Sequence, residues 1–283
     1  MTKRRQILIL LAFGLLVAVL YAIISRPREP SYGGHTLSHW VEAYGQTFAH
    51  PASVAVGPVD AQNHQEQIQN AQRQIESGQA IRCIGTNAVP YLLAWSAYEE
   101  PAWRKKLRQV LNDLPSPFNR IFALGDQRTK HAKFAYDSLR ALGPLGKQAI
   151  PVLAQRLQAP GSSHARGQVL SALAFIGKDS IPCLQQALTN RETVIRFYAL
   201  NITSILQSNA TPLVPLLIQN LTDPVRSIRA TAAGVLGNLE LRLDLVVPAL
   251  KAALKDPDPA VHQAVTKALL KIAPEALTNA PPK

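Results

Sequence analysis

The C-terminal half of the chain repeats itself at a step of 33 residues, and this feature constrains the fold most. Each copy begins with an Ile/Val-Pro pair followed by two leucines four residues apart, at Ile181, Val214 and Val247. An earlier copy begins at Ile150, 31 residues before Ile181. A period of this length is typical of arrays in which each copy is one supersecondary unit.

Each copy predicts two helices joined by a tight turn. The proline suits the first turn of a helix, here called helix A, because its missing N–H would have no partner there. Leucines four residues apart lie on one face of that helix. A short polar side chain follows at Asn190, Asp223 and Asp256, where it can cap a second helix, helix B. Helix B carries apolar residues at steps of three and four, as at Ala199 and Ile202.

A single pair of this kind cannot bury its own apolar face, whereas stacked pairs bury a continuous core. We therefore predict an all-α fold, an α-solenoid of paired helices. The alternative is an ordinary helical bundle in which the spacing is coincidental. Eight columns that recur across three copies favour the solenoid.

The columns resemble HEAT repeats, in which a proline opens helix A, an Asp lies in the turn and an Arg lies early in helix B. The step is shorter than the usual 40–47 residues of that class and is similar to its compact bacterial variety. The resemblance implies a structural ladder between neighbouring repeats, formed here by Arg196, Asp223, Arg229 and Asp256. His262 interrupts the Arg column near the end of the array.

The N-terminus carries 18 consecutive uncharged residues, Ile7 to Ile24, after Lys3, Arg4 and Arg5. As a helix they would span ~27 Å, close to the roughly 30 Å of a bilayer core. We predict an uncleaved anchor in the inner membrane; a cleaved signal peptide is the alternative. The balance of basic residues favours an extracytoplasmic, periplasmic C-terminal part, although Arg26 and Arg28 leave the reverse topology open.

A short motif follows the apolar span. Tyr32-Gly33-Gly34, with Leu37, Ser38, Trp40 and Val41 behind it, resembles a motif found after the anchor in bacterial HEAT-repeat proteins of the planctomycete–verrucomicrobium type. That resemblance supplies no biochemical activity. Residues 37–48 predict an amphipathic helix that packs on the start of the solenoid, with a membrane-surface helix as the alternative.

These features predict an order of segments along the chain. The order is a membrane anchor (1–25), a spacer with an amphipathic helix and a loop (26–63), degenerate helical repeats with a basic segment (64–142), regular repeats (143–274) and a Pro-rich tail (275–283). Pro90 and Pro151 are 61 residues apart, near two repeat steps. We therefore expect one degenerate repeat between them.

The chain is basic, with 30 Lys+Arg against 18 Asp+Glu, which favours an anionic partner. Residues 103–147 hold ten of the basic residues and three acidic ones. A candidate patch for lipid headgroups, nucleic acid or an acidic protein comprises Arg104, Lys105, Lys106, Arg108, Arg128, Lys130 and Lys133. The alternative is a solvated helical face with aromatic residues in the core, and the spread of the basic residues over at least two predicted helices favours it.

The sequence contains no catalytic or nucleotide-binding motif, neither HExxH, G-x-S-x-G, a P-loop nor G-x-G-x-x-G. His35 and His39 have a spacing that can hold a metal, but no third ligand lies near them in sequence. Cys83 and Cys183 lie in helical, apolar contexts that favour packing. We therefore predict no catalytic residue, no metal and no cofactor.

Together these observations predict a membrane-anchored scaffold that binds a protein partner without catalysing a reaction. Some HEAT-like repeats occur in bilin lyases, so an enzyme or an enzyme-maturation factor is the alternative from another class. A basic-surface binder of anionic lipid or nucleic acid is a further alternative. Nucleic-acid binding is the least expected, because it requires the reverse membrane topology.

Overall fold

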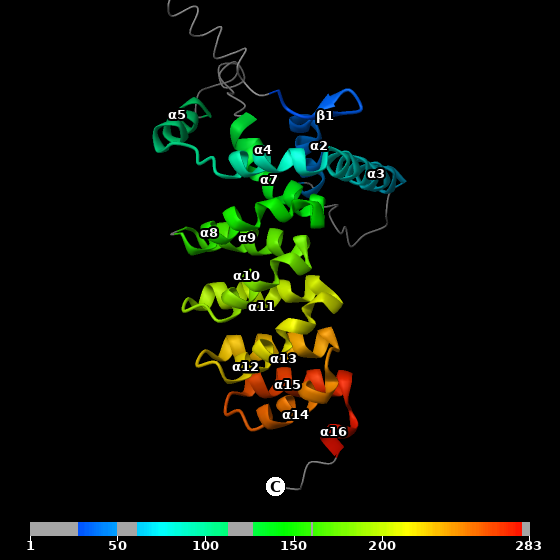
Figure 1. The fold of residues 1–283 in the computed structure, drawn as a ribbon, viewed down its shortest axis with the longest axis vertical. Helices are drawn as coiled ribbons and strands as arrows, with labels where there is room; N and C mark the ends of the chain where they lie inside the picture. The colour runs from blue at the N-terminus through cyan, green and yellow to red at the C-terminus, as the bar shows by residue number, and fades with distance from the viewer. Residues whose placement is uncertain (1–27, 50–60, 113–126, 160, 279–283) are drawn as a thin grey trace, which may run out of the picture.

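The computed structural model describes residues 28–49, 61–112, 127–159 and 161–278. These residues form an all-helical stack with one small hairpin (Figure 1). The α-helices are α2 (Leu37–Ala49), α3 (Ala61–Ile84), α4 (Val89–Ser96), α5 (Ala102–Asn112), α7 (Gln127–Leu142), α8 (Ile150–Gln158), α9 (Ser163–Ile176), α10 (Ile181–Leu188), α11 (Thr193–Thr203), α12 (Val214–Gln219), α13 (Arg226–Leu239), α14 (Leu243–Ala253), α15 (Pro259–Ile272) and α16 (Glu275–Thr278).

The predicted helical pairs are present and stacked in line along the longest axis of the molecule (Figure 1). Helices α7, α9, α11, α13 and α15 pack each on the next and form one row, which we call the B row. Helices α8, α10, α12 and α14 lie beside it, each packed on the B-row helix that follows it in sequence. The described part of the chain is therefore solenoid-like.

The repeated prolines mark helix starts in four of the five cases. Pro90, Pro151, Pro182 and Pro215 lie in the first turn of α4, α8, α10 and α12, each after a 3₁₀ turn. The expectation for Pro248 is wrong, because α14 begins at Leu243 and includes the proline in its interior. An α-helical turn replaces the preceding 3₁₀ turn here, after Arg242 in a left-handed conformation.

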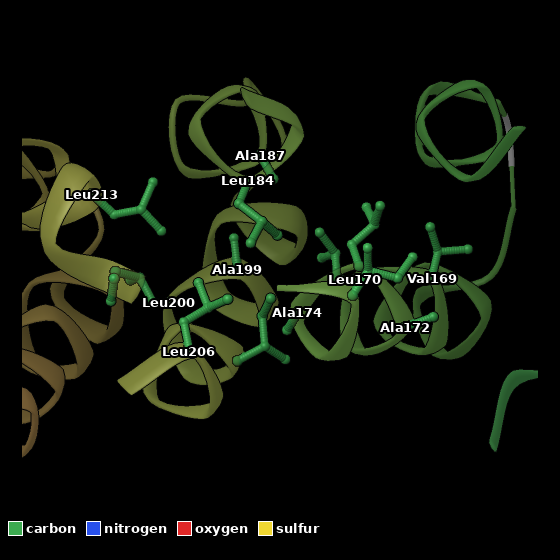
Figure 2. Packing of buried hydrophobic residues seen from close by; sticks show 14 of the residues in the cluster. Val169, Leu170, Ala172, Ala174, Leu184, Ala187, Ala199, Leu200, Leu206 and Leu213 are labelled. Carbon is green, nitrogen blue, oxygen red and sulfur yellow. The ribbon is translucent and has the colours of Figure 1, made fainter. Parts of the chain in front are cut away.

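The core runs through the whole stack. The first leucine of each helix A is fully buried, with 0–1% of its surface exposed at Leu153, Leu184, Leu217 and Leu250. Figure 2 shows Leu184 and Ala187 of α10 facing Ala199 and Leu200 of α11. Burying one leucine side chain stabilises the fold by about 2 kcal/mol. Each pair thus shares a core with its neighbours, as the 33-residue columns predict.

The N-terminal end of the stack is formed by α2 and α3, which pack on α7. The predicted helix at 37–48 is present as α2. Before it, β1 (Ser31–Tyr32) pairs with β2 (His35–Thr36) in a hairpin that the sequence analysis did not foresee. Gly33 and Gly34 have φ of +56° and +80°, a conformation that glycine adopts at low cost. The indole Nε1 of Trp40 donates to the Tyr32 carbonyl at 3.1 Å and holds the hairpin against α2.

The expectation of a degenerate repeat between Pro90 and Pro151 is wrong. Helix α4 packs directly on α7, so the two form one pair, and α7 packs on α9. The long connection between α4 and α7 contains α5, which stands beside the stack (Figure 1). An insertion of about one repeat length in the A–B turn produces the same spacing as an extra repeat.

Several predictions fall on residues that the structure does not describe. No helix among the described ranges is long and apolar enough to cross a bilayer. The predicted anchor at 7–24 lies outside those ranges, as do residues 50–60 of the loop predicted to end at residue 63. The expectation of a loop at 61–63 is wrong, because α3 begins at Ala61. Residues 275–278, predicted as tail, form α16.

Candidate interaction surface

The predicted ladder residues meet across neighbouring repeats. Arg196 of α11 donates from Nε and Nη2 to the two carboxylate oxygens of Asp223, at 2.8 and 3.0 Å. Arg229 of α13 does the same to Asp256, at 2.6 and 3.1 Å. Both bonds in each case join a planar guanidinium to one carboxylate, the geometry that gives a strong and directional contact.

Each arginine also binds the turn of its own repeat. Nη1 of Arg229 donates to the carbonyls of Asp223 and Pro224. The carboxylate of Asp256 accepts from the backbone N–H of Asp258, two residues on, and so closes the next turn. The ladder therefore fixes both the shape of each turn and its distance from the next.

Hydrogen bonding also shifts the acidity of these groups. The hydrogen bond from Arg229 lowers the pKa of Asp256, and the bond from the Asp258 N–H acts in the same direction. The same contact raises the pKa of Arg229. Both shifts favour the charged forms of Asp256 and Arg229 at neutral pH. The hydrogen bonds of all four ladder side chains are made within the protein.

One ladder contact was missed by the sequence analysis. Arg166 of α9 forms an ion pair with Glu192 of the next turn. Asn190 occupies the Asp column there, and its side-chain oxygen accepts from the Glu192 N–H instead. An acidic residue two positions after an uncharged residue in the Asp column is the signal that would have identified it. His262, which interrupts the Arg column, lies exposed on α15.

The candidate basic patch is divided between two helices. Lys105 and Lys106 are exposed on α5, and Arg104 is half-buried there. Arg128, Lys130 and Lys133 are exposed on α7, where the Lys133 ammonium lies 5.3 Å from the centre of the Phe134 ring. Arg108 belongs to α5, but its side chain is not described. The patch is therefore two basic surfaces on separate elements.

His35 and His39 lie at the N-terminal end of the stack, on β2 and α2. Their rings stack with centroids 4.2 Å apart, and both meet Trp40 edge-on. They border a hollow of about 410 Å³ between α2 and α3, which Arg73 and Glu76 also line. Within the described ranges, no three His, Cys, Asp or Glu side chains gather as a metal site would require.

The B row carries apolar residues that the sequence analysis did not single out. Val194 and Phe197 of α11 are each 40% exposed, and with Asn201 they share one face of that helix. The 33-residue step places Ala230 and Gly234 of α13 at the equivalent positions. These residues are small, so Phe197 stands out from the row. A single apolar residue on a helix cannot be distinguished from a core residue in sequence alone.

The comparison with protein families agrees with this geometry. Residues 214–280, which cover α12 to α16, match a family model described as HEAT repeats. No curated protein matches the chain. The matched segment is less than half of the chain, and it contains the Arg229–Asp256 contact. This match supports a HEAT-repeat protein.

Proposed function

We propose that this protein is a membrane-anchored scaffold that binds a partner protein along the exposed face of its B row and catalyses no reaction. HEAT repeats generally serve as protein-interaction scaffolds. The observation that carries the proposal is the exposure of Val194 and Phe197 on a continuous row of helices. An exposed aromatic residue on a rigid helix is a typical anchor in a protein interface.

The ladder side chains are bound to each other, which supports a structural role for the turns. We therefore expect the partner protein to bind the B row and not the ladder. Only 11% of the Arg196 side chain and 8% of the Asp223 side chain are exposed, and both are bound to each other. A partner that bound them would have to displace these contacts. Phe197, in contrast, is available without any rearrangement.

A photo-crosslinking residue at Phe197 tests the partner surface in the full chain within its native membranes. Leu245 on α14 is the matched control, because its exposure of 39% is nearly the same but it lies outside the B row. We expect one defined adduct at position 197, abolished by Val194→Arg, and none at position 245. Equal adducts at both positions, or none at 197, would contradict the proposal.

The anchor and its orientation need a separate test. We propose that residues 7–24 hold the protein in the inner membrane with the helical stack outside the cytoplasm, on the evidence of their uncharged sequence and the preceding basic residues. With Cys83 and Cys183 replaced by Ser, a single Ala260→Cys site is exposed for labelling. A maleimide that cannot cross the inner membrane should label it in intact cells. Labelling only after that membrane is opened would reverse the topology.

A further inference from the structure

Helix α5 is amphipathic, and its apolar face is exposed to solvent. Trp103, Leu107 and Val110 are 66%, 43% and 62% exposed. At about 100° per residue, these positions fall on one stripe of the helix. In the described part of the chain, no other helix packs broadly against α5 (Figure 1). The stripe is thus an exposed apolar surface on an ordered helix.

The rest of α5 is basic. The helix contains Arg104, Lys105, Lys106 and Arg108 and no acidic residue. By helical period, Arg104 and Lys106 border the apolar stripe on its two sides, and Lys105 lies opposite it. Long basic side chains at the borders of an apolar stripe are the arrangement of helices that lie in the surface of an anionic membrane.

The place of α5 in the fold agrees with a membrane surface. The described chain begins at Arg28, whose carbonyl accepts a hydrogen bond from the hydroxyl of Tyr91 on α4. Helix α4 is followed directly by α5. In the sequence, the apolar segment 7–24 ends four residues before Arg28, which contacts α4, the helix that precedes α5. In repeat arrays, insertions in one repeat extend from one face, often the binding face.

We propose that α5 is an interfacial helix, which lies on an anionic lipid surface and orients the stack relative to the membrane. Trp103, Leu107 and Val110 enter the boundary between headgroups and acyl chains, and the basic side chains contact lipid phosphates. Leu107 and Val110 are aliphatic and offer no stacking surface for bases, which disfavours single-stranded nucleic acid. This inference rests on the membrane attachment proposed above.

The test uses the fluorescence of Trp103 in the full chain, reconstituted into vesicles of phosphatidylcholine with or without phosphatidylglycerol. Brominated acyl chains quench a tryptophan that enters the bilayer. We expect quenching that depends on phosphatidylglycerol and that is lost in Trp103→Phe. As a matched control, Phe197→Trp in the Trp103→Phe background should add tryptophan emission to that of Trp40 and Trp95 but show no quenching by the brominated chains, because position 197 is exposed on the B row.

The contribution of charge is tested with Lys105→Gln/Lys106→Gln. Removing two lysines should lower the ratio of membrane-bound to free α5 by about 30-fold. Lys251→Gln/Lys255→Gln, an exposed pair at the far end of the stack, should leave that ratio unchanged. Both variants should still float with the vesicles, because flotation reports residues 7–24 and quenching reports α5. A protein that fails to float contradicts the anchor instead.

Three results would overturn the inference. One is the absence of a Trp103-specific quenching component in anionic vesicles that carry the protein. Another is a blue shift of Trp103 emission on adding an RNA homopolymer to the protein in detergent, which would assign the surface to nucleic acid. The third is a shift that depends on protein concentration in detergent, which would assign the stripe to a second copy of the chain.

Discussion

Arg229 donates two hydrogen bonds to the carboxylate of Asp256, and 33 residues earlier Arg196 donates two to Asp223 in the same way. Each contact joins helix B of one repeat to the turn of the next, so the ladder is a property of the stack and not of a single repeat. The side chains are mostly buried, so we expect each ion pair to stabilise the fold more than an exposed ion pair does.

The ladder predicts a coupling energy between Arg196 and Asp223. Arg196→Gln should destabilise the protein by about 2 kcal/mol, because it leaves a mostly buried carboxylate without its partner. Urea unfolding of Arg196→Gln, Asp223→Asn and the double variant gives the coupling directly, and we expect at least about 1 kcal/mol. Arg226→Gln is the control, since its side chain is 76% exposed. Additive effects at 196 and 223 would contradict the ladder.

The pKa shifts predict the acid side of the stability curve. The pKa of Asp256 is lowered in the folded state, mainly by the Arg229 hydrogen bond. The contribution of Asp256 to the stability of the protein is therefore complete above the pKa of the unfolded state, about 3.9. It is lost as the pH falls through the lower pKa of the folded state. Asp256→Asn should make the loss of stability on acidification shallower. The change of melting temperature between about pH 2 and 6, a range around the unfolded pKa of Asp, measures this effect.

Asp137 provides the opposite control. Burial raises the pKa of this carboxyl, although Arg140 works against the shift. A carboxyl whose pKa is raised in the folded state stabilises the protein at low pH. This contribution is lost as the pH rises from the pKa of the unfolded state to that of the folded state. Asp137→Asn should therefore make the acid limb steeper. A shift of the limb in the same direction for both variants would show that these carboxylates do not determine it.

Two glycines three residues apart on α13 predict effects of opposite sign. A Cβ at Gly237 would lie 2.6 Å from the Cβ of Ala268 and 2.8 Å from its Cα, so Gly237→Ala should push α13 away from α15. A Cβ at Gly234 would meet nothing within 4 Å. Gly234→Ala should stabilise the helix by about 0.5–1 kcal/mol. Stabilisation by both substitutions, measured by urea unfolding, would show that α13 and α15 are not in close contact.

A strained residue predicts a gain of stability. Gln207 has φ of 48° and ψ of −124°, a conformation that glycine adopts far more readily than other residues. Gln207→Gly should raise the free energy of unfolding by up to about 1 kcal/mol, since relief of strain outweighs the added freedom of the unfolded chain. Gln263→Gly, at an exposed position inside α15, should lower it by a similar amount. Equal losses at both positions would contradict the strain.

The repeat columns determine the fold well because each one has a single physical cause. Leu184, Leu217 and Leu250 are spaced by the repeat and are all buried. A repeat spacing does not distinguish two arrangements that produce it equally, as with the insertion that contains α5. The role of Glu192 was not predicted, because Asn190 stands at the position where the other repeats have an Asp. Glu192, two residues later, provides the carboxylate that pairs with Arg166.

Surface features were harder to predict than core features for a related reason. Burial imposes a period on a helix, whereas exposure imposes none, so Phe197 carries no signal in sequence. The seven residues of the candidate basic patch were grouped from the sequence, yet the structure divides them between α5 and α7. Only the placement of the helices shows that α5 combines charge with an exposed apolar stripe.

The continuity of the core is tested most directly by hydrogen exchange on Leu217→Asp. The substitution puts an unpaired charge at a fully buried position and should cost about 4 kcal/mol or more. Because neighbouring pairs share one core, we predict loss of protection in α12 together with α10, α11, α13 and α14, while α2 and α3 remain protected. Leu270→Asp, at a 57% exposed position, should change little. Loss of protection confined to α12, or an unchanged melting temperature, would contradict a stack of interdependent repeats.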